Sequence, residues 1–348
     1  MSDAARPALS VLDLVPVRTG QTSAQAIAAS LTVAQRADEL GYRRYWFAEH
    51  HNMPAVASTT PPVLIAAAAS RTSRIRVGSG GVMLPNHSPL VVAEQFAALE
   101  AIAPGRVDLG IGRAPGSDPV ITQLLRQSGT TSDVDRFPDN IRDILALVSG
   151  DGATVRFTSG GTYDVHATPA ATSTPDVWLL GSSDYSAQLA AALGLPYVFA
   201  NHFSGEGLDR AIGLYRDQFR PSETLDAPRT FLTANAVVAD SDAEAEALML
   251  PQARMMARLR SNRPLAALES VEEAAAAEAS DHLAGPMLDA MRSRWFVGTG
   301  PEARSALTAF AAQHGVDEVM VSPVSASYDG EQADTAPTRI RTLELLAA

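Results

Sequence analysis

Short apolar segments alternate with segments of helical periodicity along most of the chain, and this alternation limits the possible folds more than any other feature. The eight apolar segments lie at residues 9–15, 43–47, 75–84, 107–112, 175–180, 197–200, 229–238 and 317–321. Such alternation is typical of a parallel sheet covered by helices. Eight units favour a closed barrel over an open doubly wound sheet, and no G-x-G-x-x-G motif follows the first segment. We therefore predict an α/β protein with a (β/α)8 TIM-barrel fold.

The remaining segments are expected to decorate this barrel. Helices are predicted within residues 118–149, 240–259 and 268–279. A stretch rich in Gly, Thr and Ala at 150–174 is expected to form an irregular insertion or a small hairpin. No linker or change of composition divides the chain, so we expect residues 1–348 to form a single domain.

The composition of the chain excludes some kinds of chemistry and argues against several classes of binding partner. The 348 residues contain no cysteine, which excludes disulfides and thiolate chemistry. The formal net charge is -12 with acidic residues scattered along the chain, which argues against nucleic acid or an anionic membrane as a partner. The N-terminus lacks a basic stretch followed by an apolar core, and no run approaches the roughly 18 apolar residues of a membrane span. We therefore expect a cytoplasmic protein.

Two glycines interrupt the third apolar segment. Gly80 and Gly81 would weaken a strand unless the strand bulges there, or another backbone or a flat ligand comes close. The next strand ends at Gly112 and Arg113. Because arginine offers a fixed fork of donors, Arg113 is suited to an anion. The alternative is a tight bend in the sheet with an ordinary surface arginine.

Polar residues gather where the predicted strands end, and (β/α)8 barrels carry their reacting groups at those ends. Ser182 and Ser183 open a helix after the fifth predicted strand. The helix N-terminus, the two hydroxyls and Arg113 would together suit a phosphate group. Simple N-capping of the helix by either serine is the alternative.

Two adjacent histidines end the second predicted strand. The side chains of His50 and His51 must diverge, so only one of them can face the barrel mouth. A group that titrates near neutrality suits general acid–base work beside a ring, whereas the alternative is a hydrogen-bonded loop histidine. A metal site would need further ligands such as Glu49, His202 or Asp13, and no His-x-His pair or carboxylate-rich strand end supports one.

Three separated motifs carry a family resemblance. The segments LGYRRYWFAEHHN, RIRVGSGGVMLPNHSPLVVAEQFAALEAIAPGRVDLGIGR and VWLLGSSDYSAQLAAALGLPYVFANHF occur in this order along the chain. Together they resemble the bacterial luciferase-like flavin-dependent monooxygenases, and most closely the luciferase-like class, or alkanal monooxygenase-like, oxidoreductases. The resemblance extends over residues 9–323 and is weakest at 150–174 and 255–291.

The resemblance implies a barrel that binds reduced FMN at its C-terminal mouth, with the FMN supplied by a separate NAD(P)H:flavin reductase. With O2 the reduced FMN would form a C4a-peroxyflavin that oxidises a small aldehyde- or ketone-like substrate. The family also implies a homodimer that packs through its early helices, where the small-residue helix at 63–69 would permit close approach. It further implies a mobile lid, which corresponds to residues 255–291.

The same resemblance assigns roles to individual residues. His50 matches the catalytic histidine, and Glu49 matches a position near the flavin and the subunit interface. A non-prolyl cis peptide that supports the flavin ring is expected at Gly80-Gly81. Glu94 matches a helix residue close to the flavin. The phosphate-binding positions match Arg113, Ser183 and Ser186, and Ser182 adjoins them.

Three other functions compete with this interpretation. A deazaflavin-dependent dehydrogenase of the same superfamily would transfer hydride without O2, and a non-catalytic flavin-binding protein would bind FMN without turnover. A metal-dependent barrel hydrolase is the third alternative, and metal analysis of the purified protein would test it.

Overall fold

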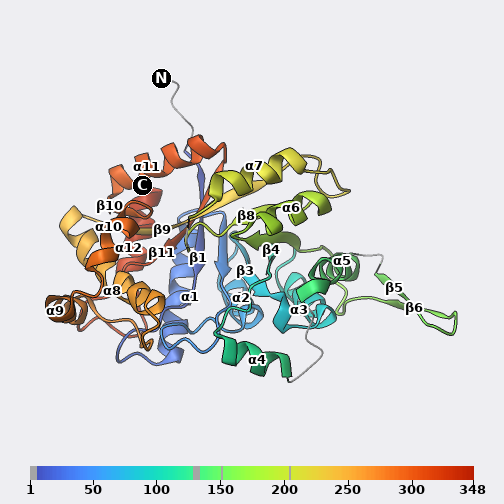
Figure 1. The fold of residues 1–348 in the computed structure, drawn as a ribbon, viewed down its shortest axis with the longest axis horizontal. Coiled ribbons are helices and arrows are strands. Elements are labelled where there is room, and N and C mark those ends of the chain that lie inside the picture. The colour runs from blue at the N-terminus through green and yellow to red at the C-terminus, as the bar shows by residue number, and fades with distance from the viewer. Residues whose placement is uncertain (1–5, 128–133, 150–151, 204) are drawn as a thin grey trace.

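Eight parallel strands close into a barrel with helices around it (Figure 1). The computed structural model describes residues 6–127, 134–149, 152–203 and 205–348. The barrel closes because the first strand pairs with both the second and the last. The strands, in their order around the barrel, are β1 (Ala8–Asp13), β2 (Arg44–Phe47), β3 (Arg76–Met83), β4 (Val107–Gly112), β7 (Asp176–Gly181), β8 (Tyr197–Phe199), β9 (Thr230–Ala239) and β11 (Glu318–Pro323). The (β/α)8 barrel predicted from the sequence is confirmed.

Helices follow the strands and pack on the outside of the barrel. The first begins with a capping box in which Thr22 and Gln25 bond reciprocally, so Thr22 is the N-cap. These helices are α1 (Ser23–Glu39), α2 (Pro61–Ala69), α3 (Pro89–Ile102), α5 (Phe137–Val148), α6 (Asp184–Leu193), α7 (Leu208–Gln218), α11 (Gly300–His314) and α12 (Pro337–Ala347).

Other helices and strands lie in the loops that follow the barrel strands or project from the barrel. The insertion contains the predicted hairpin, which projects from the body (Figure 1). Of the predicted helical stretch 118–149, residues 128–133 lie outside the described residues. These elements are η1 (Leu84–Asn86), α4 (Pro119–Gln127), η2 (Val134–Arg136), β5 (Ala153–Arg156), β6 (Thr162–Val165), α8 (Asp242–Arg260), α9 (Val271–Asp281), α10 (Gly285–Arg292) and β10 (Phe296–Thr299). None of the helices in the described ranges is both long and apolar enough to cross a bilayer.

The sequence interpretation omitted α10 and β10. Strand β10 has only four residues and pairs with the C-terminal half of β9, beyond the point where β9 leaves β8. The sequence FVGT contains only two large apolar residues, whereas the equally short β2 (RYWF) and β8 (YVF) contain three each, so no apolar run marks β10 in the sequence.

Aromatic side chains fill the inside of the barrel. Trp46, Trp178 and Phe231 pack with ring centroids 5.0–5.8 Å apart, in tilted and edge-on arrangements. Such pairs add to the stabilisation from the apolar area that they bury. The other buried members of this inner cluster are Leu12, Ala48, Val198 and Met320.

A buried ionic network closes the N-terminal end of the barrel. The carboxylate of Asp108 accepts hydrogen bonds from Arg44 Nη1 at 2.8 Å, Arg76 Nη2 at 2.6 Å and Trp46 Nε1 at 2.9 Å. Arg44 also donates from Nε to Glu318 at 2.9 Å. Because Asp108 is fully buried, its removal would leave two guanidinium groups with fewer partners in a region shielded from water.

We therefore expect Asp108→Ala to lower the free energy of unfolding by about 3–5 kcal/mol, as measured by urea denaturation. The control is Asp139→Ala, which breaks the exposed pair between Asp139 and Arg142 on α5 and should cost about 0–1 kcal/mol. Equal effects of the two substitutions would contradict the structural role assigned to the buried network.

Candidate active site

The barrel mouth, meaning the C-terminal ends of the barrel strands and the loops that follow them, collects most of the predicted site residues. Glu49, His50 and His51 follow β2, and Arg113 follows β4. Ser182 and Ser183 lie between β7 and α6. The parallel strands bring these positions to one end of the barrel, as the sequence predicted.

Glu49 is an anchor between two strand ends. Its Oε1 accepts hydrogen bonds from His51 Nε2 and His87 Nε2, both at 2.8 Å, and its Oε2 accepts one from the Met83 backbone N–H at 3.0 Å. Burial favours the neutral acid, but the hydrogen bonds from the two histidines outweigh it and lower the pKa of Glu49 to about 2. An ionised carboxylate can only accept, so each of these histidine nitrogens carries a hydrogen.

His50 and His51 point in different directions, as predicted. His51 turns to Glu49, whereas the Nδ1 atom of His50 is buried without a hydrogen-bond partner among the described residues. Burial lowers the pKa of His50, so its ring is neutral at pH 7. A neutral imidazole with an unsatisfied nitrogen can exchange a proton or a hydrogen bond with a bound ligand.

Gly80 and Gly81 are joined by a cis peptide bond, which confirms that expectation. The register of β3 against β4 shifts between Gly80 and Val82. A Cβ atom on Gly81 would lie 2.8 Å from the Gly110 carbonyl oxygen, and one on Gly80 would lie 2.6 Å from Leu12 Cδ1. The sequence offered a bulge, a close backbone or a flat ligand as reasons for these glycines. The structure shows a bulge in β3 and the close backbone of Gly110, so packing within the protein is enough to explain them.

Arg113 and the serines lie around the start of α6. The guanidinium carbon of Arg113 lies 4.2 Å from the centroid of the Tyr185 ring. Ser182 and Ser183 are exposed, and Ser183 is the N-cap residue but makes no side-chain capping hydrogen bond. The capping alternative is therefore not realised. Cation, hydroxyls and helix N-terminus form a donor set with the chemistry that a phosphate requires.

Two predicted residues have partners within the protein. Ser186 is buried, and its hydroxyl donates to the Ser183 carbonyl oxygen at 2.8 Å, so it supports the turn that presents Ser183. Glu94 lies on α3 and accepts a hydrogen bond from Thr168 Oγ1 at 3.1 Å, which ties it to the insertion. Direct contacts of either side chain with a flavin stay predictions.

His202 lies near His50 at the barrel mouth. The sequence placed it after the sixth predicted strand and offered it as a conceivable metal ligand. It follows β8, and its Nδ1 atom lies 2.9 Å from Thr233 Oγ1 on β9. Burial, together with the charge of nearby His50, lowers the pKa of His202 to about 4. The only signal in the sequence was its place directly after an apolar strand.

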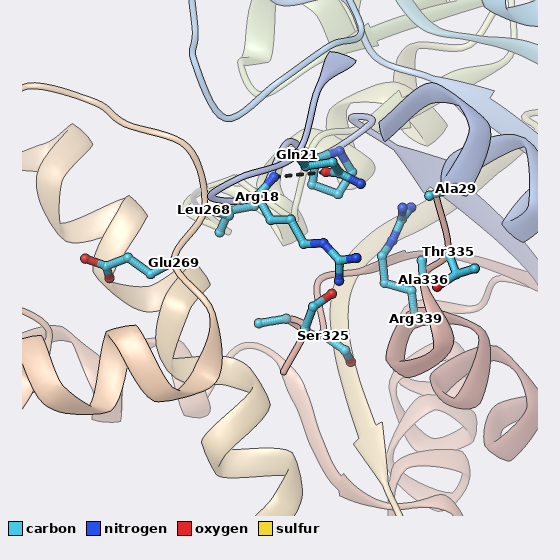
Figure 2. Close-up of a pocket in the computed structure, with 12 residues that line it drawn as sticks. Arg18, Gln21, Ala29, Leu268, Glu269, Ser325, Thr335, Ala336 and Arg339 are labelled. Carbon is cyan, nitrogen blue, oxygen red and sulfur yellow. Dashed lines mark hydrogen bonds between the residues drawn. The ribbon is translucent and has the colours of Figure 1, made fainter. Parts of the chain in front are cut away.

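Among the residues that the structure describes, neither a metal site nor the small cavity of Figure 2 is part of this arrangement. Within the described ranges, no group of three or more His, Cys, Asp or Glu residues could hold a metal ion. The cavity has a volume of about 40 Å³ and is lined by residues of other loops and helices, including Arg18, Leu268 and Arg339 (Figure 2). That volume suits a few water molecules rather than a flavin.

Comparison with known proteins agrees with the fold. Residues 8–318 match the family model described as luciferase-like monooxygenase. A protein of Escherichia coli strain K12 named luciferase-like monooxygenase is 46% identical over 253 residues, which cover 73% of each chain. The crystal structure of apo-MsnO8 is 34% identical and superposes with a TM-score of 0.83, covering 98% of this chain and 97% of that one.

Two more distant structures share the fold alone. One is the oxygenating constituent of 3,6-diketocamphane monooxygenase from Pseudomonas putida in complex with FMN, with 18% identity, a TM-score of 0.72 and coverage of 99% of this chain and 97% of that one. The other is an F420-dependent secondary alcohol dehydrogenase, with 16% identity, a TM-score of 0.67 and coverage of 98% of both chains. The fold therefore accommodates both flavin and deazaflavin coenzymes.

The low pKa of His202 predicts a pH dependence of stability. Between pH 6.5 and pH 4 this histidine takes up a proton in the unfolded chain but not in the folded one, so acidification through this window destabilises the fold. In His202→Asn, the loss in free energy of unfolding between pH 7 and pH 5 should be smaller than in the wild type by about 1–2 kcal/mol. Urea titrations at the two pH values measure it. Identical losses in the two proteins would show that His202 titrates normally.

Proposed function

The chain belongs to the luciferase-like monooxygenase family, and we therefore propose that it is an FMN-dependent monooxygenase acting on a small aldehyde- or ketone-like substrate. It is an oxidoreductase, since its relatives are named monooxygenases. The observation that carries the cofactor assignment is the cationic Arg113 beside the exposed serines and the start of α6, at the same barrel end as His50. This arrangement suits a ligand with a phosphate at one end and a reactive ring at the other.

The residues present fit such a ligand. Arg113, Ser182 and Ser183 would hold the phosphate with their donors and the N-terminus of α6. The ring would lie in the barrel mouth, where the buried Nδ1 atom of His50 lacks a partner among the described residues. Glu49 would have a structural role and would not contact the ring, because its oxygens already accept hydrogen bonds from two histidines and a backbone N–H.

Reduced FMN supplies the two electrons with which O2 is split, so that one oxygen atom enters the substrate and the other leaves as water. A separate NAD(P)H:flavin reductase would provide the reduced flavin. His50, neutral at pH 7, would donate and accept a proton at the reacting centre. The oxygen chemistry expected from the resemblance remains a prediction.

Binding and turnover assays separate this function from its alternatives. We expect the purified protein to bind FMN more tightly than coenzyme F420 in fluorescence titrations. With FMN, NAD(P)H and a flavin reductase, it should convert a member of an aldehyde and ketone panel to a product labelled by ¹⁸O2. Tighter binding of F420 with hydride transfer in the absence of O2 would favour the deazaflavin alternative. Tight FMN binding without product from any panel member would favour a non-catalytic flavin-binding protein.

His50→Gln should lower kcat in that assay by about 10²- to 10⁴-fold, because general acid–base catalysis contributes an effect of this size. The dissociation constant for FMN should change much less. His166→Gln replaces an exposed histidine of the insertion and is the control. Unchanged turnover in His50→Gln would exclude the catalytic role.

Residues 255–291 would form the lid of the site. Helix α9 and the segment before it are joined to α8 through Arg254, which is fully buried and donates to Glu269 at 2.7 Å and to Glu278 and Asp281. The guanidinium of Arg254 therefore fixes the position of α9 relative to α8. Opening of the lid would take place around this anchor.

An apolar surface on α2 and α3 supports a homodimer. Val63 is 65% exposed, Val91 48% and Ile102 56%, on two helices that pack side by side. Large exposed apolar side chains on neighbouring helices are typical of protein interfaces. The helices are those through which the family resemblance places the subunit contact.

Val91→Asp should shift the protein from dimer to monomer in sedimentation velocity, since it places a charge in the apolar contact. Val155→Asp, at a residue of similar exposure on the projecting hairpin, should leave the dimer intact. A wild-type protein that sediments as a monomer would contradict the assignment.

A further inference from the structure

Arg113 has an unusual environment for a cation in a chain with a net charge of -12. Its side chain forms no ion pair with any residue that the structure describes, although such pairs occupy many other arginines, for example Arg44, Arg210 and Arg339. Its contact is instead the ring of Tyr185, 4.2 Å from the guanidinium carbon. The charge of Arg113 is thus held in place without being neutralised.

The geometry of this contact leaves the donors of Arg113 available. A guanidinium that stacks on an aromatic ring uses its face, whereas its five N–H groups point outward from the edge of the plane. An ion pair with a carboxylate would instead engage two of those donors. The contact with Tyr185 therefore restricts the side chain and engages no hydrogen-bond acceptor, so the donors of Arg113 form no ion pair with any residue that the structure describes.

The carboxylate next to Tyr185 in the sequence is occupied elsewhere. Asp184, which precedes Tyr185 in the first turn of α6, accepts a hydrogen bond from Arg210 Nε of α7 at 2.9 Å. Because Arg210 engages this carboxylate, Asp184 does not compete for Arg113. The same pairing reduces the negative charge beside Ser182 and Ser183, where the phosphate would bind.

We propose that Tyr185 is a positioning residue for cofactor binding: its ring preorganises Arg113 for the phosphate of the flavin. This inference rests on the proposed function, in which Arg113 binds that phosphate. Preorganisation increases affinity because less side-chain entropy is lost on binding. Removing the ring should therefore weaken binding of the phosphate alone, and should leave contacts with the isoalloxazine ring unchanged.

The test compares two flavins that differ only in the phosphate. Dissociation constants for dithionite-reduced FMN and reduced riboflavin are measured by anaerobic titration calorimetry on the full-length wild type, Tyr185→Leu and Tyr185→Phe. Circular dichroism melts of each variant confirm folding. Tyr185→Phe keeps the aromatic face, whereas Tyr185→Leu keeps only apolar bulk.

We expect the wild type to bind FMN more tightly than riboflavin. Tyr185→Leu should weaken FMN binding about two- to fivefold and leave riboflavin binding unchanged, and Tyr185→Phe should resemble the wild type. In an Arg113→Ala background, Tyr185→Leu should have no further effect, because the interaction that it removes is already absent.

Different outcomes refute different statements. Equal affinity of the wild type for FMN and riboflavin would refute the phosphate role of Arg113 and with it the proposed function of this end of the site. A preserved preference for FMN that Tyr185→Leu does not reduce would refute only the role of Tyr185. The same follows if Tyr185→Phe loses as much affinity as Tyr185→Leu, or if the effect persists without Arg113.

Discussion

The barrel mouth depends on one buried carboxylate. Glu49 accepts hydrogen bonds from His51, from His87 and from the Met83 backbone, and so ties the loop after β2 to the end of β3 and to the segment that leads into α3. A buried charge is costly unless it is fully hydrogen-bonded, and the low pKa of Glu49, about 2, shows that its partners compensate the burial. This carboxylate holds His51, whereas the buried Nδ1 atom of His50 has no hydrogen-bond partner among the residues that the structure describes.

The two ends of the barrel use polar residues in opposite ways. At the N-terminal end, Asp108 joins Arg44 and Arg76 in ion pairs that occupy their donors and stabilise the closed sheet. At the mouth, Arg113 contacts the ring of Tyr185 and forms no ion pair with any residue that the structure describes. The charges that stabilise the barrel therefore lie at the opposite end from the candidate site.

Several parts of the site follow from local sequence, and others require the fold. Gly80 and Gly81 were predicted to mark a bulge or a close approach, because glycine in a strand interior has few other uses. The divergence of His50 and His51 followed from the alternation of side chains along a strand. In contrast, the contact of Arg113 with Tyr185 joins the loop after β4 to α6, and no local pattern reports it. The partnership of His202 with Thr233 spans 31 residues and two strands in the same way. The buried, internally bonded hydroxyl of Ser186 also becomes visible only in three dimensions.

The central claim is that a flavin lies across the barrel mouth, with its phosphate at Arg113 and its ring beside His50. A crystal structure of the protein soaked with FMN tests this claim most directly. The account predicts phosphate density within hydrogen-bonding distance of Arg113 and the Ser182–Ser183 turn, and ring density in the mouth near the Gly80-Gly81 peptide. FMN density at any other place on the molecule, such as the small cavity near Arg339, would contradict it.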